Sequence, residues 1–323
     1  TTEDLNNIGA GIYTVTATDP NGLTISLEIE ITEPAELTAT ETISSYECGY
    51  GVTCFGATDG SIDITVEGGC EPYSFAWSNG ETTEDISNLG VGTYSVDITD
   101  ANGCTFNIPS IEITEPAELI ATESISSYEC GFGVSCYGAT DGSIDITVEG
   151  GCEPYSFAWS NGETTEDLNN IGAGIYTVTA TDANGCFIDI EVEITEPAEL
   201  TITETHSSYE CEYGVTCFGA TDGSIDITVE GGCEPYSFAW SNGETTEDLN
   251  NIGAGIYTVT ATDPNGLTIS LEIEITEPAE LTATETISSY ECGYGVTCFG
   301  ATDGSIDITV EGGCEPYSFA WSN

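Results

Sequence analysis

The sequence predicts an all-β protein, built as a tandem array of small two-sheet sandwich modules of about 81 residues that together form a rod. Two observations predict it: a regular internal repeat, and apolar residues that alternate with polar ones between turn signals. The repeat is marked by four tryptophans in steps of 82, 81 and 81 residues, at Trp77, Trp159, Trp240 and Trp321. Pairs such as Gly68-Gly69 and Asn79-Gly80 supply the turns, because hairpin turns need positive φ.

Four segments of each module carry the alternation, and each is expected to form a strand with one buried face. They are represented by residues 24–32, 61–69, 73–80 and 92–100. With about seven short strands per module and no sustained helical stripe, the pattern favours two packed sheets with the acidic residues outside. The expected inward residues are Ile25, Leu27, Ile29, Ile31, Ile62, Ile64, Val66, Tyr73, Phe75, Trp77, Tyr94, Val96 and Ile98.

Module boundaries are set at the recurring motif EPAEL, in which proline fixes φ and disfavours helix, so the linkers are expected to be stiff. This gives the C-terminal part of a repeat (1–36), three full repeats (37–118, 119–199 and 200–280) and the N-terminal part of a repeat (281–323). Residues 1–79 are identical to residues 245–323, so three modules form a super-repeat of 244 residues. The first residues, TTEDLNNIGAG, lack the basic and apolar regions of a signal peptide, and we expect a mature segment of a longer array.

The run GGCEPYSFAWSNGETTEDISNLGVGTYSVDITDANGC, residues 68–104, resembles the repeat of the SprB-type cell-surface adhesins of gliding Bacteroidetes. That repeat is itself similar to the PKD and immunoglobulin-like sandwich families. The resemblance covers every module. It implies an extracellular stalk or filament of a secreted adhesin that extends a functional tip and supports surface adhesion or gliding motility.

The charge is entirely acidic, with 57 Asp and Glu, one His and neither Lys nor Arg. Without cations the chain cannot bind nucleic acid through a basic face or dock on anionic lipid. No run approaches eighteen apolar residues, so this segment is not expected to insert into a membrane. The acidic residues are interpreted as a hydrated surface, with calcium binding as the alternative, because calcium prefers several oxygens in one place. The candidate ligands for calcium, the one cofactor considered, are Asp59, Asp63, Glu33 and Glu36.

Fourteen cysteines in small modules indicate an oxidising, extracellular setting. The favoured pairing within a module is Cys48 with Cys54 and Cys70 with Cys104; the rival is Cys54 with Cys104 and Cys48 with Cys70, and the sequence does not choose among the three connectivities. The disulfide candidates are Cys48, Cys54, Cys70, Cys104, Cys130, Cys136, Cys152, Cys186, Cys211, Cys217, Cys292 and Cys298.

One cysteine of each super-repeat is expected to lack a partner within it, because the super-repeat holds eleven, an odd number. Cys233 is the first candidate, since its expected partner position is Leu267, and Cys314 is the second. The interpretations are a buried free thiol or a covalent link to a neighbouring chain.

No enzymatic activity is expected. The acidic pair Glu84-Asp85 recurs in a turn without pocket residues around it, and one histidine cannot serve a repeated catalytic site. The first hypothesis is therefore a structural stalk whose partner is itself, through modules joined end to end. The alternatives are multivalent binding of surface polysaccharide, with Tyr46 and Tyr50 as sugar-stacking residues, or lateral self-assembly through calcium or odd cysteines.

Overall fold

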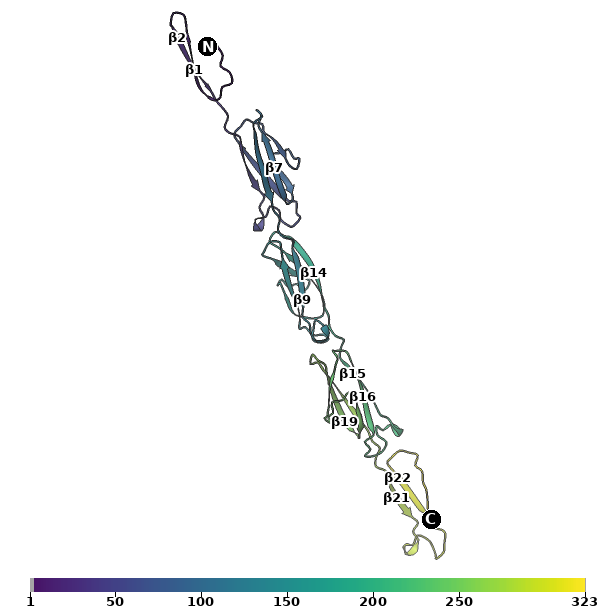
Figure 1. The fold of residues 1–323 in the computed structure, drawn as a ribbon. Coiled ribbons are helices and arrows are strands. Elements are labelled where there is room, and N and C mark those ends of the chain that lie inside the picture. The colour runs from purple at the N-terminus through teal and green to yellow at the C-terminus, as the bar shows by residue number, and fades with distance from the viewer. Residues whose placement is uncertain (1–2, 323) are drawn as a thin grey trace. The chain divides into compact units, whose positions relative to one another are not determined.

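The computed structural model describes residues 3–322, which form antiparallel strands joined by turns and short 3-10 helices (Figure 1). The chain divides into two compact units. The first runs through Glu123 and adds Ile146–Glu166 and Thr177–Glu191; the second contains Ser124–Asp145, Asp167–Tyr176 and the chain from Val192 onward. The division passes through the middle full repeat, whose two ends belong to different units.

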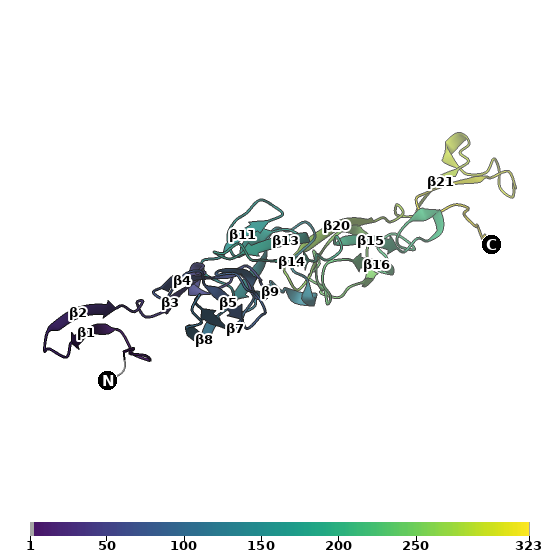
Figure 2. The same cartoon turned by 90° about the horizontal axis from the view of Figure 1, so that it is seen from above.

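The first full repeat is a sandwich of two three-stranded sheets, and strands from both sheets are labelled in Figure 2. One sheet has the order β3 (Thr38–Ile43), β4 (Gly60–Glu67), β6 (Ile86–Leu89). The other has the order β5 (Ser74–Trp77), β7 (Gly92–Thr99), β8 (Thr105–Ile113). This is the arrangement of an immunoglobulin-like domain in which strands A, B and E face strands C, F and G.

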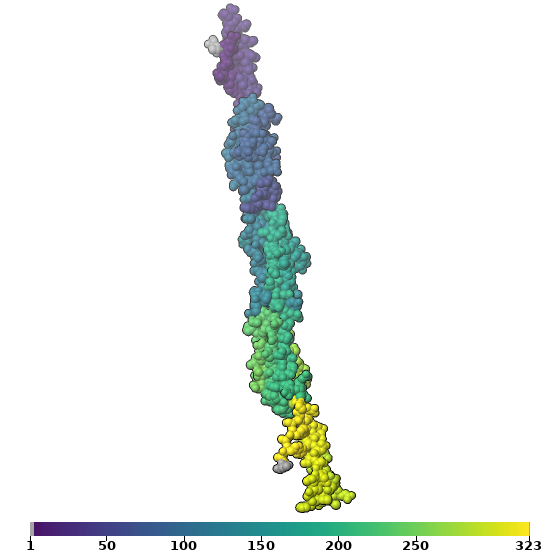
Figure 3. All heavy atoms as spheres, turned by 90° about the vertical axis from the view of Figure 1, so that its right-hand side faces the viewer, coloured from purple at the N-terminus to yellow at the C-terminus, as the bar shows by residue number. Residues whose placement is uncertain are grey.

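The core of this repeat lies between the two sheets and confirms the predicted strand faces. Ile62 and Ile64 from β4 and Val96 and Ile98 from β7 are all buried in one apolar cluster. Trp77 is also buried, and its indole N–H donates to the carbonyl oxygen of Thr83 at 2.9 Å. Figure 3 shows the same repeat with its heavy atoms as spheres, which form a continuous surface on the face in view.

Tyr94 provides a second hallmark of the fold. Its hydroxyl donates to the carbonyl oxygen of Gly90, four residues upstream, at 3.1 Å. Tyr257 makes the same bond to Gly253 at 3.0 Å in the third full repeat. A tyrosine at the start of strand F that bonds back to the preceding backbone is a recurrent corner of immunoglobulin-like sandwiches.

The structure has six strands per full repeat where about seven were expected. The segment between β3 and β4, residues 44–59, forms a loop around the 3-10 helix η1 (Glu47–Gly49). Its glycines and closely spaced turns interrupt any alternating pattern, and Cys48 has a φ of 62° inside the helix. We call residues 44–59, and the equivalent segment of every repeat, the cysteine loop.

The first full repeat is one residue longer than the other two. β8 contains Pro109, and its register with β7 shifts between Tyr94 and Val96. Proline cannot donate to a ladder of hydrogen bonds and is accommodated at edge strands and bulges. β19 and β20, the equivalent strands of the third full repeat, pair without a shift.

The other two full repeats have the same two sheets. In the second the strands are β9 (Ile120–Ile125), β10 (Gly142–Glu149), β12 (Leu168–Ile171) and β11 (Ser156–Trp159), β13 (Gly174–Thr181), β14 (Phe187–Ile194), with η2 (Glu129–Gly131) in the cysteine loop. In the third they are β15 (Thr201–His206), β16 (Gly223–Glu230), β18 (Leu249–Ile252) and β17 (Ser237–Trp240), β19 (Gly255–Thr262), β20 (Thr268–Ile275), with η3 (Glu210–Glu212).

The partial repeats at the two ends each contribute one hairpin. The first pairs β1 (Gly11–Thr18) with β2 (Thr24–Ile31), and the last pairs β21 (Thr282–Ile287) with β22 (Ile306–Glu311), with η4 (Glu291–Gly293) between them.

Candidate functional site at the junction between repeats

Within the first compact unit, the cysteine loop of the first full repeat meets two turns of the second. The disulfides are Cys48–Cys152 and Cys54–Cys186, with Cα–Cα distances of 5.9 and 5.8 Å. Both distances lie in the range of about 4.4–6.8 Å that disulfides require. The bonds span 104 and 132 residues of sequence, so they join consecutive repeats rather than closing loops inside one.

Asn184 adds hydrogen bonds beside the disulfides. Its Oδ1 accepts the backbone N–H of Glu47 at 3.0 Å, and its Nδ2 donates to the carbonyl oxygen of Thr53 at 3.1 Å. Both partners belong to the preceding repeat. A single half-buried amide therefore uses its donor and its acceptor on the neighbouring cysteine loop, which fixes the position of that loop more narrowly than either bond alone.

A buried carboxylate positions both cysteines of the second repeat. Asp182 is only 5% exposed and accepts the backbone N–H groups of Cys152 and Cys186, each at 2.9 Å. Because one side chain bonds to both turns, the two cysteines are held at the same end of the sandwich. The turn of sequence Asp-Ala-Asn-Gly-Cys thus places one sulfur and one amide toward the preceding repeat, and the turn of Cys152 places the second sulfur there.

Asp100 performs the same task in the first full repeat. Its carboxylate accepts the N–H groups of Cys104 at 2.8 Å and Cys70 at 3.0 Å. The backbone N–H of Cys104, assisted by those of Cys70, Asn102 and Gly103, holds the pKa of Asp100 below its usual value, although burial opposes the effect.

The shape of the cysteine loop is set by Asp59. Its carboxylate accepts the backbone N–H of Thr53 at 3.1 Å and the Thr53 hydroxyl at 2.6 Å. Burial raises the pKa of Asp59, but the hydrogen bonds from Thr53 outweigh it and the net direction is downward. The Tyr46 hydroxyl donates to the carbonyl oxygen of Asp59 at 3.0 Å. These hydrogen bonds join Tyr46 and Thr53 to Asp59, so they restrain the loop that contains Cys48 and Cys54.

The linker between the two repeats is bonded at both of its ends. Thr114 accepts the N–H of Gly51 at 3.0 Å through its carbonyl, and the Glu115 carboxylate accepts the N–H of Gly56 at 2.7 Å. Two residues after Glu115, the carbonyl of Ala117 accepts the N–H of Gly151 in the next repeat at 2.9 Å. The expected stiffness of the EPAEL motif thus has a second source besides proline.

The expected disulfide pairing within a module was wrong for the bonded cysteines. Cys48 bonds to Cys152 instead of Cys54 or Cys70, and Cys54 bonds to Cys186. The turns of Cys70 and Cys104 do lie at one pole, as expected, and the N–H of Ala101 donates to the carbonyl of Cys70 at 2.9 Å. The expected pairing failed because the bonded cysteines belong to two consecutive modules. The pole of a module that carries these two turns is the end that meets the preceding repeat.

The other cysteines are thiols in the structure, including Cys233 and Cys314, which were expected to lack a partner, and eight of the disulfide candidates. Only the reason given for Cys233 was wrong. Leu267 does not occupy its partner position: the thiol of Cys233 is buried against Cys130 of the preceding repeat, and Cys314 lies in the same way against Cys211. The thiols are Cys70, Cys104, Cys130, Cys136, Cys211, Cys217, Cys233, Cys292, Cys298 and Cys314.

The four candidate calcium ligands are exposed at different places on the surface. Asp63 lies on the outer face of β4, Asp59 closes the cysteine loop, and Glu33 and Glu36 lie in the linker after β2. Across residues 3–322, no three or more side chains of His, Cys, Asp or Glu are grouped as a metal site would need. Calcium binding stays a prediction.

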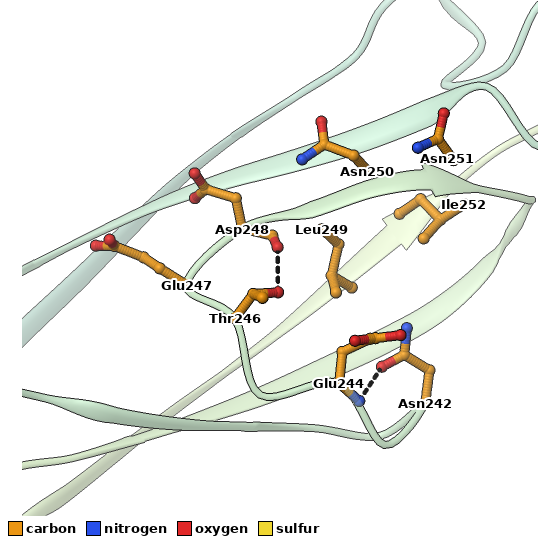
Figure 4. Close-up of a pocket in the computed structure, with 9 residues that line it drawn as sticks. All are labelled: Asn242, Glu244, Thr246, Glu247, Asp248, Leu249, Asn250, Asn251 and Ile252. Carbon is orange, nitrogen blue, oxygen red and sulfur yellow. Dashed lines mark hydrogen bonds between the residues drawn. The ribbon is translucent and has the colours of Figure 1, made fainter.

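The acidic pair Glu84-Asp85 has a structural role. Asp85 accepts the backbone N–H of Ile64 in β4 at 2.9 Å, and Asp248 accepts that of Ile227 at 3.0 Å in the third full repeat. Around Asp248 the turn encloses an open depression, in which Thr246 donates to the Asp248 carbonyl at 2.7 Å (Figure 4). Its lining is acidic and amide side chains with Leu249 and Ile252 beneath, and it contains no aromatic platform for a sugar.

Sequence reasoning missed Asp182 and Asn184 as junction residues. An Asp-x-Asn-Gly tetrapeptide is typical of a hairpin turn, which accounts for Asn184 without any contact to another repeat. The available signal was the association of this tetrapeptide with a cysteine immediately after it in two repeats, at Cys104 and Cys186.

None of the helices in the described part of the chain is long and apolar enough to cross a membrane. No curated protein matches the sequence.

Three solved structures are similar to parts of this chain. Extracellular domains 3–5 of Drosophila OTK match with 12% identity and a TM-score of 0.24, covering 69% of this chain and 92% of that one. The amphioxus IgVJ-C2 molecule matches with 18% identity and a TM-score of 0.21, covering 48% and 96%. Cadherin domains 1–5 of protocadherin gamma B2 match with 10% identity and a TM-score of 0.23, covering 83% and 71%. At these scores the similarities carry no argument about function.

The family model named SprB repeat matches residues 52–82, 134–164, 215–245 and 296–323. Each match begins in a cysteine loop and continues through the tryptophan of its module, which is buried in the three full repeats and 66% exposed in the last, partial one. In the full repeats a match therefore includes one half of the junction and part of the sandwich core. The SprB repeat thus occurs four times in this chain, once in each successive module from residue 37 onward.

Proposed function

We propose that this chain is the stalk region of a secreted cell-surface adhesin, in which the repeats form a stiff, acidic filament that carries an adhesive tip away from the cell. The SprB repeats support a place in a cell-surface adhesin. The stalk role is supported chiefly by one observation: the two disulfides Cys48–Cys152 and Cys54–Cys186 join consecutive repeats.

Two covalent attachments restrain a neighbouring repeat more than a linker does. A single linker permits bending and twisting about one point, whereas the linker and two disulfides attach the same pair of repeats at three places. Asn184 and the hydrogen bonds of Thr114, Glu115 and Ala117 reduce the remaining freedom. A stiff joint is what a stalk needs, because its reach then depends on the number of repeats.

The net charge of −57 fits the same role. Like charges on every repeat disfavour folding back of one repeat on another and keep neighbouring filaments apart at low ionic strength. The side chains that gather at the junction serve to hold repeats together, and we therefore assign the repeats themselves no catalytic reaction.

Small-angle X-ray scattering on the 323-residue chain tests the stalk. The oxidised protein is expected to have a maximum dimension close to the summed lengths of its repeats, and reduction is expected to shorten and broaden the distance distribution as the joints loosen. The Cys136→Ser variant, which removes no bonded cysteine, serves as the control. A compact oxidised particle would contradict the proposal.

Binding of polysaccharide by the repeats is the rival, and a glycan array with the same chain distinguishes it. A stalk binds none of the sugars, whereas specific binding would reassign the repeats as the adhesive element. Antibody labelling of intact cells against permeabilised cells tests the surface location, and signal only after permeabilisation would contradict it.

A further inference from the structure

The junction between the second and third full repeats, which lies inside the second compact unit, has the same hydrogen bonds as the disulfide-bonded junction. Asn265 accepts the backbone N–H of Glu129 at 3.2 Å, as Asn184 accepts that of Glu47 at 3.0 Å. Asn265 also donates to the carbonyl of Ser135 at 2.9 Å, as Asn184 does to Thr53 at 3.1 Å. The cysteine loop and the turn of the next repeat therefore meet in the same arrangement at both junctions.

The sulfurs of this second junction occupy equivalent positions. Cys233 Sγ lies 3.1 Å from the Glu129 carbonyl oxygen, and the bonded Cys152 Sγ lies 3.1 Å from the Glu47 carbonyl oxygen. Cys152 and Cys233 are both 1% exposed. Cys130, like Cys48, has a left-handed backbone, with φ of 64° and 62°. The backbone around the thiols is thus already that of the bonded pair.

We propose that Cys130 and Cys233 form a disulfide, and that Cys211 and Cys314 form the next one, so that each junction at which a cysteine loop of this chain meets the following repeat carries the clamp seen between Cys48 and Cys152. The Cys314 Sγ lies 3.3 Å from the carbonyl oxygen of Glu210, which continues the series. The clamp is independent of whether the array is a stalk.

The reaction is a thiol–disulfide exchange with an external disulfide such as oxidised glutathione. Cys130 is exposed and meets the oxidant first, forming a mixed disulfide and releasing one glutathione thiol. Cys233 then attacks the Cys130 sulfur, which releases the second glutathione thiol. The two protein thiols lose two protons and two electrons in total, and the glutathione disulfide is reduced to two thiols.

Burial of Cys233, together with its hydrogen bond to Cys130, raises the pKa of Cys233 to about 12. Cys233 is therefore protonated at neutral pH, which agrees with Cys130 as the thiol that reacts first.

The second disulfide of the bonded junction has no counterpart here. The position equivalent to Cys186 is Leu267, whose side chain packs against the apolar core of the third full repeat. Cys136, the counterpart of Cys54, therefore faces no cysteine. This identifies Cys136, and not Cys233, as the odd cysteine of the super-repeat.

Differential thiol labelling of the whole chain tests the pairing. The protein is oxidised with glutathione disulfide and its free thiols are blocked with N-ethylmaleimide. It is then reduced, labelled with iodoacetamide and digested with endoproteinase Glu-C, which cleaves after glutamate and leaves residues 130–149 as one peptide. The peptide spanning Cys130 and Cys136 is unique in the sequence because of Phe132. We expect it to carry one maleimide, on Cys136, and one carbamidomethyl group, on Cys130.

Two variants make the result specific. In Cys233→Ser the same peptide is expected to carry two maleimides, whereas in the matched control Cys152→Ser it keeps one. Circular dichroism confirms that each variant folds. Two maleimides on this peptide in the oxidised wild-type protein would overturn the proposal. A Cys130–Cys136 disulfide would also overturn it, and mass spectrometry of the unreduced digest detects that bond as a peptide two hydrogens lighter than its dithiol form. An unchanged single maleimide in Cys233→Ser would overturn it as well.

Discussion

Asn184 accepts the backbone N–H of Glu47, a residue of the preceding repeat, at 3.0 Å. The repeat that follows reproduces the bond, with Asn265 accepting the N–H of Glu129 at 3.2 Å. Two equivalent asparagine side chains, one in each repeat, thus hold two successive cysteine loops in place.

Asn265→Ala is expected to release the Glu129 amide. Loss of a hydrogen bond of this kind costs about 1 kcal/mol, so hydrogen exchange at Glu129 should accelerate about fivefold. Mass spectrometry of the peptide that contains Phe132 measures it, because that peptide is unique in the chain. Asn184→Ala is the matched control and is expected to leave this peptide unchanged. Equal acceleration in both variants would show that the bond does not act locally.

The aspartates that close the cysteine loops should stabilise the folded modules when they are ionised, and this stabilisation should be lost when acid protonates them. The Thr216 hydroxyl and backbone N–H lower the pKa of Asp222 from 3.8, and the pKa values of Asp59, Asp141 and Asp303 are lowered too. A lowered folded-state pKa gives stability that is present above the unfolded value and lost as pH falls through the folded value.

The measurement compares wild type with a variant carrying Asp→Asn at all four positions. The melting temperature of wild type is expected to be higher between pH 5 and 7, with a difference that shrinks below about pH 4. The general repulsion among acidic residues acts on both proteins and largely cancels. A difference that grew on acidification would contradict the assigned sign.

Salt should stabilise the folded array. With 57 acidic residues and no Lys or Arg, screening relieves repulsion that ion pairs do not offset. The Debye length falls from about 30 Å at 0.01 M to about 3 Å at 1 M. Melting followed by circular dichroism is expected to shift upward by several degrees over this range, equally in sodium and potassium chloride. Millimolar calcium that raised the melting temperature beyond an equal ionic strength of sodium chloride would instead support the predicted calcium site.

Gly150 should not tolerate a side chain. Its φ is 84°, and a Cβ there would overlap the carbonyl oxygen of Glu118 in the linker. Gly162 has a φ of 92° with open space around it, so Gly162→Ala isolates the cost of the backbone conformation, about 1–2 kcal/mol. Gly150→Ala is expected to cost more than that and to loosen the linker. Chemical denaturation compares them, and an equal loss would exclude the clash.

The strand faces were predictable because alternation of period two follows directly from strand geometry. The burial of the inward residues was less predictable, since it depends on whether a second sheet covers them. Val15 and Val259 have identical sequence neighbours, yet Val15 is 50% exposed beside β2 alone, whereas Val259 is 0% exposed inside a complete sandwich. The same contrast separates Ile29, 46% exposed, from Ile273, 4% exposed.

The junction was not predictable from one module. Cys48 and Cys152 are 104 residues apart, and their contact depends on which pole of a repeat meets its neighbour. A Cys48–Cys54 bond would close only a short ring, but the backbone of Cys48 is left-handed, with a φ of 62°, and its sulfur bonds to Cys152 of the next repeat. The repeat period identified the modules, but the disulfides lie at the junction between one module and the next.

The Cys48–Cys152 bond also changes the route by which tension travels along the chain. A pull applied outside these residues passes through the two sulfurs and bypasses the 104 residues of sequence between them, which fully stretched would add roughly 350 Å. The strands β4 to β8 lie within that bypassed segment, so they are shielded from the pull for as long as the sulfur–sulfur bond survives, whereas β3 of the same sandwich lies outside it.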